Sequence, residues 1–422
     1  HRDLHSFPTR RSSDLARNGV ALLVYDHAGL GERREFWDRV LNEPLLGESP
    51  TNEHDRTGDV ATLAGVQPSR FYLTEALVAR AFLATFPFVK PGRIGVTGAS
   101  GGATLTRFAA AYDDDWAFAI PACIIRGEHV IGGGDAEQCC WGSGARGVAP
   151  VDLLATMVPR PVMIISEPPY DGAAVSFATL KRLYELAGAP DAAEFFAIDD
   201  EHGYTHPMIE AAYRFLARRF DLRPADPDSW RHVRRASESD LRCTAGGLID
   251  RERPQARLLD QIAALVPAEP IGLSRDNLAD VLGIEDWDRA PVPYAFACDG
   301  GSVDDCAGVV RVLGGDHLQP CQLGLLWLDE PHEPAWHGGR RFLYRSRMVS
   351  QARTLLSVDR CMVGLWVRQI LDFLADHKGK VKRLIADDLW AVPVAFACAL
   401  ADKRLLPARS EEHTSELQSP NT

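Results

Sequence analysis

A serine lies in a short glycine-rich turn, and the residues around it could make it a nucleophile. The five residues Gly98-Ala99-Ser100-Gly101-Gly102 fit the pattern G-x-S-x-G. A short apolar strand precedes them and a segment with helical periodicity follows them, which is the strand–turn–helix context of a nucleophile elbow. The pattern predicts an exposed Ser100 hydroxyl. It also predicts that the Gly101 N–H faces a developing oxyanion, at the positive end of the following helix.

The outer glycines of this pattern have a mechanical role in the prediction. The chain must reverse from a strand into a helix within a few residues, so the backbone at the serine is expected to be strained. We expect a Cβ at Gly98 or Gly102 to collide with the neighbouring strand or helix. A glycine-rich turn that carries an incidental serine is the competing interpretation.

A histidine and two acids follow the serine in an order that suits a catalytic triad. His202 precedes a glycine and is the expected base, with His206 as the second choice. Imidazole titrates near neutral pH and can accept the serine proton. Asp171 is the preferred acid for orienting the imidazole, because a glycine and a helix follow it. Glu167 lies closer to the preceding strand and is the alternative acid.

Strands and helices alternate around these residues. Buried strands are predicted from apolar runs at 19–25, 117–125, 162–165 and 194–198, and helices from the periodicity at 71–86, 175–186 and 208–220. The polar segment 35–70 is expected to be an irregular excursion. The alternation predicts an α/β fold with a doubly wound, mostly parallel sheet, and the chemical residues follow the carboxyl ends of its strands.

Residues 16–220 resemble the α/β-hydrolase superfamily and, within it, the acetyl xylan esterase and dienelactone-hydrolase-like group. The elbow carries the resemblance to the superfamily, and the order serine, acid, histidine agrees with it. The group is suggested by DHAGLGER (26–33), DAEQ (135–138), PRPVMII (159–165) and EHGY (201–204). The resemblance implies serine-dependent hydrolysis of a small-molecule or carbohydrate ester, with no metal and no organic cofactor. A non-catalytic carbohydrate- or protein-binding relic and a serine peptidase of the same fold are the alternatives.

Charge and composition exclude some classes of partner. The formal net charge is −12, which argues against binding to nucleic acid or to an anionic membrane. No apolar run reaches membrane-spanning length. The nine cysteines show no C-x-x-C spacing, and the adjacent pair Cys139 and Cys140 favours packing over metal or redox chemistry. The sequence fixes neither the oligomeric state nor the cellular location.

Both ends of the chain match translated sequencing adapters. Back-translated, residues 1–15 fit one short-read adapter and residues 409–422 fit the opposite one. We therefore expect the natural segment to be 16–408 and exclude both ends from the fold. The first domain is then expected to lack its opening strands and the loop with the second oxyanion donor. This fragment is accordingly expected to be poorly soluble or inactive.

The second half of the chain is predicted to repeat the first. Residues 221–247, rich in Pro, Asp, Arg and Ser, are the predicted linker, and 248–408 the second domain. A shift of 288 positions aligns several identical residues of the two halves without a gap. The same shift pairs Ser100 with Asp388, Gly98 with Ala386 and Gly102 with Trp390. The second domain is therefore expected to be a degenerate, truncated hydrolase-like domain without a serine nucleophile, and an unrelated α/β module is the alternative.

Overall fold

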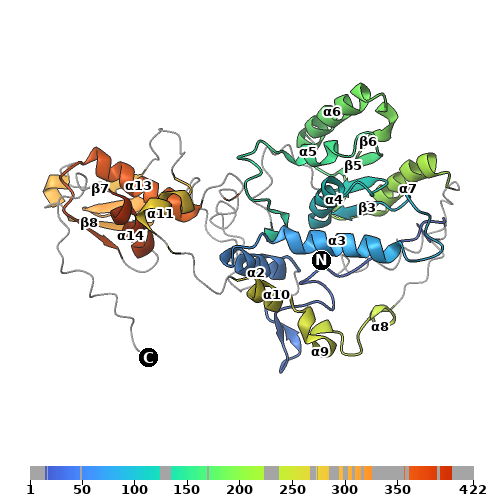
Figure 1. Ribbon diagram of the computed structural model, residues 1–422, viewed down its shortest axis with the longest axis horizontal. Helices are drawn as coiled ribbons and strands as arrows, with labels where there is room; N and C mark the ends of the chain where they lie inside the picture. Colours follow the sequence, from blue (N-terminus) through green and yellow to red (C-terminus); the bar gives the residue numbers. More distant parts are fainter. Residues whose placement is uncertain are drawn as a thin grey trace. The chain divides into compact units, whose positions relative to one another are not determined.

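In the computed structural model the chain forms two units, His1–Pro267 and Ala268–Thr422 (Figure 1). The described residues are 15–16, 18–47, 50–123, 135–168, 171–222, 237–266, 272, 274–284, 294–297, 303–306, 309–314, 318–325, 356, 361–386 and 390–401. Apart from Leu15, the adapter-like ends lie outside these ranges. Leu15 packs against the core around Met208 and Phe215.

A four-stranded parallel sheet forms the centre of the first unit. The strands lie side by side in the order β3 (Val96–Ala99), β4 (Ala119–Ala122), β5 (Val162–Ser166) and β6 (Ala193–Ala197). Every residue of β4 and β5 is buried. Strands covered on both faces are expected to be apolar throughout, and these two are mostly so. The predicted α/β class, with a parallel sheet and flanking helices, is confirmed for this unit.

Helices cover both faces of this sheet. On one face, the last helix packs against Ile120 and Met163, and on the other face three helices pack against Ala119 and Val162. Adjacent residues of a strand point to opposite faces, so these neighbours belong to two separate cores. The first face is covered by α7 (His206–Phe220), and the second by α4 (Gly101–Tyr112), α5 (Pro150–Ala155) and α6 (Asp171–Leu186), with α3 (Ser69–Leu83) packed on α4 (Figure 1).

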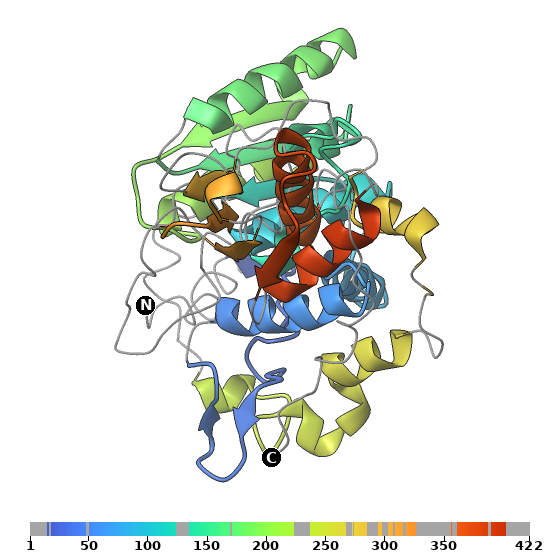
Figure 2. The same cartoon turned by 90° about the vertical axis from the view of Figure 1, so that its left-hand side faces the viewer.

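Two segments of the first unit differ from the sequence predictions. Residues 19–25 form no strand among the described residues, and they line a cavity of about 410 Å³ beside β3. The segment 35–70, expected to be irregular, contains the helix α2 (Pro50–Leu63). Its apolar periodicity is weak because four buried residues of its first turns, 52–55, are polar. A short hairpin, β1 (Trp37–Asp38) with β2 (Glu43–Pro44), precedes it (dark blue in Figure 2).

The segment 237–266 packs on the first unit. Leu258 and Ile262 are buried against Ala61 and Val66, and the Leu258 N–H donates to Glu35 Oε1 at 2.7 Å. The division between the units therefore lies after Pro267, whereas the sequence places it at residue 248. The short elements here are α8 (Glu238–Leu241), α9 (Ile249–Glu252), η5 (Pro254–Ala256) and α10 (Leu258–Leu265), and the single turns η2 (Ala136–Gln138) and η3 (Pro190–Ala192) lie earlier.

The second unit has its own four-stranded sheet and its own core. Strand β8 runs parallel to both β10 and β9, whereas β7 is antiparallel to β9. The core gathers apolar side chains from the three helices that the structure describes in this unit and from the sheet, including Trp366, Ile370 and Phe373. The elements are α11 (Arg275–Val281), β7 (Ala295–Ala297), η6 (Val303–Cys306), β8 (Val309–Gly314), β9 (Gln322–Leu325), α13 (Met362–Asp376), β10 (Arg383–Ala386) and α14 (Ala391–Leu400).

The order α13, β10, α14 in the second unit matches the order α3, β3, α4 in the first. The shift of 288 positions carries Val96 of β3 onto Leu384 of β10, and Phe108 of α4 onto Phe396 of α14. This order is what a duplication predicts. The duplication stays a prediction, and Asp388, the residue paired with Ser100, lies outside the described residues.

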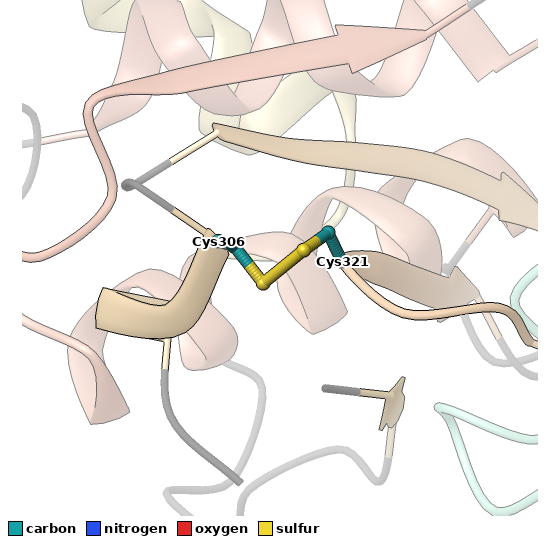
Figure 3. The surroundings of a disulfide bond; sticks show 2 residues. All are labelled: Cys306 and Cys321. Carbon is teal, nitrogen blue, oxygen red and sulfur yellow. A yellow bond between two sulfur atoms is a disulfide. The ribbon is translucent and has the colours of Figure 1, made fainter. Parts of the chain in front are cut away.

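A disulfide joins Cys306 at the end of η6 to Cys321 just before β9 (Figure 3). Their Cα atoms are 5.4 Å apart, within the ordinary range for such a bond. The sequence did not predict this pairing, since a separation of 15 residues matches no cysteine motif. Among the described residues, no helix is long and apolar enough to cross a membrane, and no cluster of His, Cys, Asp and Glu is arranged for a metal ion.

Candidate active site

Ser100 occupies the turn between β3 and α4 in a backbone conformation that side chains rarely adopt. Its φ is 57° and its ψ is −121°. A positive φ at a non-glycine residue costs on the order of 1–3 kcal/mol and persists only where the surroundings enforce it. Here the Ser100 N–H donates to Ala122 O at the end of β4 (3.0 Å), and the Ser100 carbonyl accepts from the Ala103 N–H at the start of α4 (2.8 Å). The strain expected at the serine is therefore observed.

The two outer glycines of the turn do not have equal space. A Cβ on Gly98 would lie 2.6 Å from the carbonyl oxygen of Gly102, so the backbone of α4 excludes any side chain there. A Cβ on Gly102 would meet no heavy atom within 4 Å outside its own helix. The collision expected at Gly102 is therefore wrong. The first turn of α4 passes over Gly98, whereas Gly102 faces open space.

Glu167 Oε1 contacts Nδ1 of His202. Glu167 is the first residue after β5, and its side chain is 15% exposed, whereas that of His202 is 54% exposed. A carboxylate on Nδ1 holds a proton there and leaves Nε2 to act as an acceptor.

The sequence favoured Asp171 for this contact, but the structure brings the alternative acid to the histidine. Glu167 stands at the carboxyl edge of the sheet, where its long side chain reaches the loop that follows β6. Asp171 begins α6, and its side chain lies outside the described residues. His206, the second choice for the base, is the first residue of α7.

Two buried side chains hold the loop that carries His202. The Tyr204 hydroxyl hydrogen-bonds to Thr97 Oγ1 on β3 at 3.0 Å. The Cys123 thiol donates to the carbonyl of Gly203 at 3.3 Å. Burial raises the pKa of the Cys123 thiol to about 12, so it remains a neutral donor at physiological pH. The sequence analysis missed both contacts. A polar or thiol residue on a strand beside the elbow was the one feature that could have indicated them.

Ser100, Glu167 and His202 follow the carboxyl ends of β3, β5 and β6, which share one edge of a parallel sheet. In the part of the chain that the structure describes, no hydrogen bond joins Ser100 Oγ to the His202 ring. Gly101 is the first residue of α4. Its N–H therefore belongs to the group that a helix leaves without an intrahelical acceptor, and an anion could bind there.

No protein-family model matches the sequence, and no curated protein matches it. Similar solved structures include Methylesterase BT1017, at 21% identity and a TM-score of 0.43, covering 62% of this chain and 58% of that chain. A carbohydrate esterase family 15 glucuronoyl esterase from Caldicellulosiruptor kristjansonii has 17% identity and a TM-score of 0.29, covering 40% and 53%. A glucuronoyl esterase from Solibacter usitatus has 16% identity and a TM-score of 0.30, covering 42% and 52%. All three are esterases by name, and this chain spans less than two thirds of each.

Proposed function

We propose that the first unit is a serine-dependent hydrolase of carboxylic esters, with Ser100 as nucleophile, His202 as base and Glu167 as the orienting acid. The strained backbone of Ser100 carries the proposal. Such strain is expected where a fold holds a nucleophile in place, and a glycine-rich turn with an incidental serine has no need of it. The contact between Glu167 and His202 on the same sheet edge supports the other two roles. Glu167 thereby replaces Asp171 as the proposed acid.

The reaction proceeds in two steps. Ser100 Oγ attacks the ester carbonyl carbon while its proton passes to Nε2 of His202, and the Glu167 carboxylate stabilises the imidazolium. The histidine then gives that proton to the departing alkoxide, so an alcohol leaves and an acyl-enzyme remains. Water, deprotonated by the same nitrogen, attacks the acyl carbon and releases the carboxylic acid and the free serine.

The Gly101 N–H is the proposed oxyanion donor. Negative charge develops on the carbonyl oxygen in both tetrahedral intermediates, and a fixed N–H at a helix start stabilises it without reorganisation. Removing one such donor typically costs about 10²–10³ in rate. The position of Gly101 directly after the serine, at the first residue of α4, supports this role.

An acylated carbohydrate is the proposed substrate, in line with the acetyl xylan esterase-like group that the sequence resembles. A panel of candidate substrates tests this choice. It contains p-nitrophenyl esters, acetylated xylan, a glucuronate methyl ester and a peptide p-nitroanilide. Turnover of the anilide without ester turnover would favour a peptidase. An absence of turnover on the whole panel would favour a binding protein.

Covalent labelling tests the nucleophile directly. A fluorophosphonate probe should label the full chain at Ser100, as located by mass spectrometry. Ser100→Ala should abolish labelling and lower kcat by on the order of 10⁴–10⁶. The matched control is Ser143→Ala, since Ser143 is a buried serine whose hydroxyl donates to Cys140 O at 2.8 Å. Ester turnover that survives in Ser100→Ala would overturn the proposal.

A further inference from the structure

The first turns of α2 bury polar side chains where an ordinary helix would bury apolar ones. Asn52, Glu53, His54 and Asp55 are all 8% exposed or less. Burying polar groups is costly unless each one has a partner. His54 is the member that connects this helix to the proposed oxyanion donor.

Polar side chains of helix α2 contact the single turn η2. Asp55 Oδ1 accepts a hydrogen bond from the Ala136 N–H at 3.2 Å. His54 Nδ1 lies 3.4 Å from Glu137 Oε1, and the two side chains are 10% and 3% exposed. The other ring nitrogen of His54 has no hydrogen-bond partner among the described residues, so the polar contact of this ring is with Glu137.

The Glu137 carboxylate in turn lies against Gly101. Its Oε1 is 2.9 Å from the position that a Cβ on Gly101 would occupy. The neighbouring Gln138 completes the docking of η2 on α4, because Gln138 Oε1 accepts a hydrogen bond from Thr104 Oγ1 at 3.1 Å. A buried carboxylate is thus fixed beside the backbone N–H that is proposed to bind the oxyanion.

A carboxylate at this place would oppose catalysis if it were alone. Ordinary bond lengths put an oxyanion on the Gly101 N–H within about 8 Å of Glu137 Oε1. Two negative charges at that separation, partly shielded from water, slow a reaction by on the order of tenfold. A positive charge next to the carboxylate removes most of this repulsion.

His54 is placed to supply that charge. Burial by itself lowers the pKa of His54, but the Glu137 carboxylate, with Asp135 and Asp55, outweighs burial and leaves the pKa above its ordinary value. The ring of Tyr72 lies edge-on to His54 at 5.3 Å, and Gly29 lies against the same imidazole. The Glu137 carboxylate, 3.4 Å from Nδ1, therefore makes His54 easier to protonate than an ordinary histidine.

We propose that His54 is a positioning residue of the ester hydrolase site, which holds Glu137 against Gly101 and neutralises its charge beside the oxyanion. This inference rests on the proposed function. The Glu137 carboxylate should therefore lower kcat only when His54 is absent.

Three variants of the full chain test this: His54→Gln, Glu137→Gln and the double variant. Steady-state kinetics on p-nitrophenyl acetate at pH 7.5 should show kcat about tenfold lower in His54→Gln, with KM within about twofold. The loss of kcat in Glu137→Gln should be smaller. The double variant should recover to the level of Glu137→Gln, because the unbalanced carboxylate is gone. A His54→Gln variant within about twofold of the parent in kcat, or a double variant no better than His54→Gln, would overturn the proposal.

His27→Gln is the matched control. His27 forms a half-buried pair with Glu75, at 2.8 Å and with side chains 18% and 15% exposed, and its ring also neighbours Tyr72. It has no contact with Glu137 among the described residues, so kcat should stay within about twofold of the parent. Fluorophosphonate labelling separates the two proposals. A parent protein that is neither labelled nor active refutes the esterase function, whereas a labelled, active parent with an equally active His54→Gln refutes only the role of His54.

Discussion

Glu167, the first residue after β5, contacts Nδ1 of His202 with a largely buried carboxylate. If this carboxylate fixes the tautomer of the base, Glu167→Gln should lower kcat by up to about 10⁴ while KM changes little. Asp171→Asn should stay within about twofold of the parent. Steady-state ester hydrolysis of both variants decides between the two acids. A large loss in Asp171→Asn with a small one in Glu167→Gln would restore the acid that the sequence favoured.

The two outer glycines of the elbow should respond oppositely to alanine. In Gly98→Ala the new methyl would lie 2.6 Å from the carbonyl oxygen of Gly102, so either α4 or the serine must move. We expect a loss of about 1–3 kcal/mol in the free energy of unfolding and slower labelling of Ser100. Urea denaturation and the rate of fluorophosphonate labelling measure these effects.

Gly102→Ala is the control, since a Cβ there meets nothing outside its own helix. Alanine in a helix is favoured over glycine by about 0.5–1 kcal/mol, so this variant should be slightly more stable and label normally. A Gly98→Ala protein as stable and as reactive as the parent would show that the first turn of α4 tolerates displacement.

The parallel sheet and the serine turn could be predicted because their signals are local. Strands such as β5 are continuous apolar runs, and the Ser100 turn is a five-residue pattern between two recognisable elements. The acid could not be chosen locally, since Glu167 and Asp171 both follow β5, and only the reach of a side chain to the next loop separates them. The pattern for α2 was hidden because its buried face carries His54 and its polar neighbours. A helix that buries polar groups has no apolar stripe to detect.

The anchors of the site were hidden for a similar reason. Thr97 and Cys123 are ordinary strand residues by type, and their partners Tyr204 and Gly203 lie about 80 to 107 positions away in the chain. Such pairs exist only once the sheet has formed. The sequence therefore indicates the proposed nucleophile more directly than the contacts that would position the proposed base.

Loss of the Glu194 ion pairs should make the first unit less stable in acid. Burial raises the pKa of Glu194, but Arg218 and Arg219, at 2.6 and 2.7 Å, outweigh burial and lower it below its usual value. The stabilisation is therefore full above the ordinary pKa of about 4.5 and is lost as the pH falls through the lower folded-state value. Urea denaturation should show the parent more stable than Glu194→Gln at pH 7, with the gap closing toward pH 3. A gap that widens on acidification would contradict this sign.

The disulfide between Cys306 and Cys321 should stabilise the second unit. A crosslink that closes a loop of about 15 residues is worth about 3 kcal/mol, mainly by restricting the unfolded chain. The double variant Cys306→Ser/Cys321→Ser should therefore unfold earlier in urea, as followed by tryptophan fluorescence, to which Trp366 and Trp390 of that unit contribute. Dithiothreitol should shift the parent to the midpoint of the variant and leave the variant unchanged. Cys398→Ser, which changes an exposed cysteine of α14 outside the disulfide, should match the parent. If dithiothreitol does not move the midpoint of oxidised parent protein, the crosslink adds nothing to the stability of this unit.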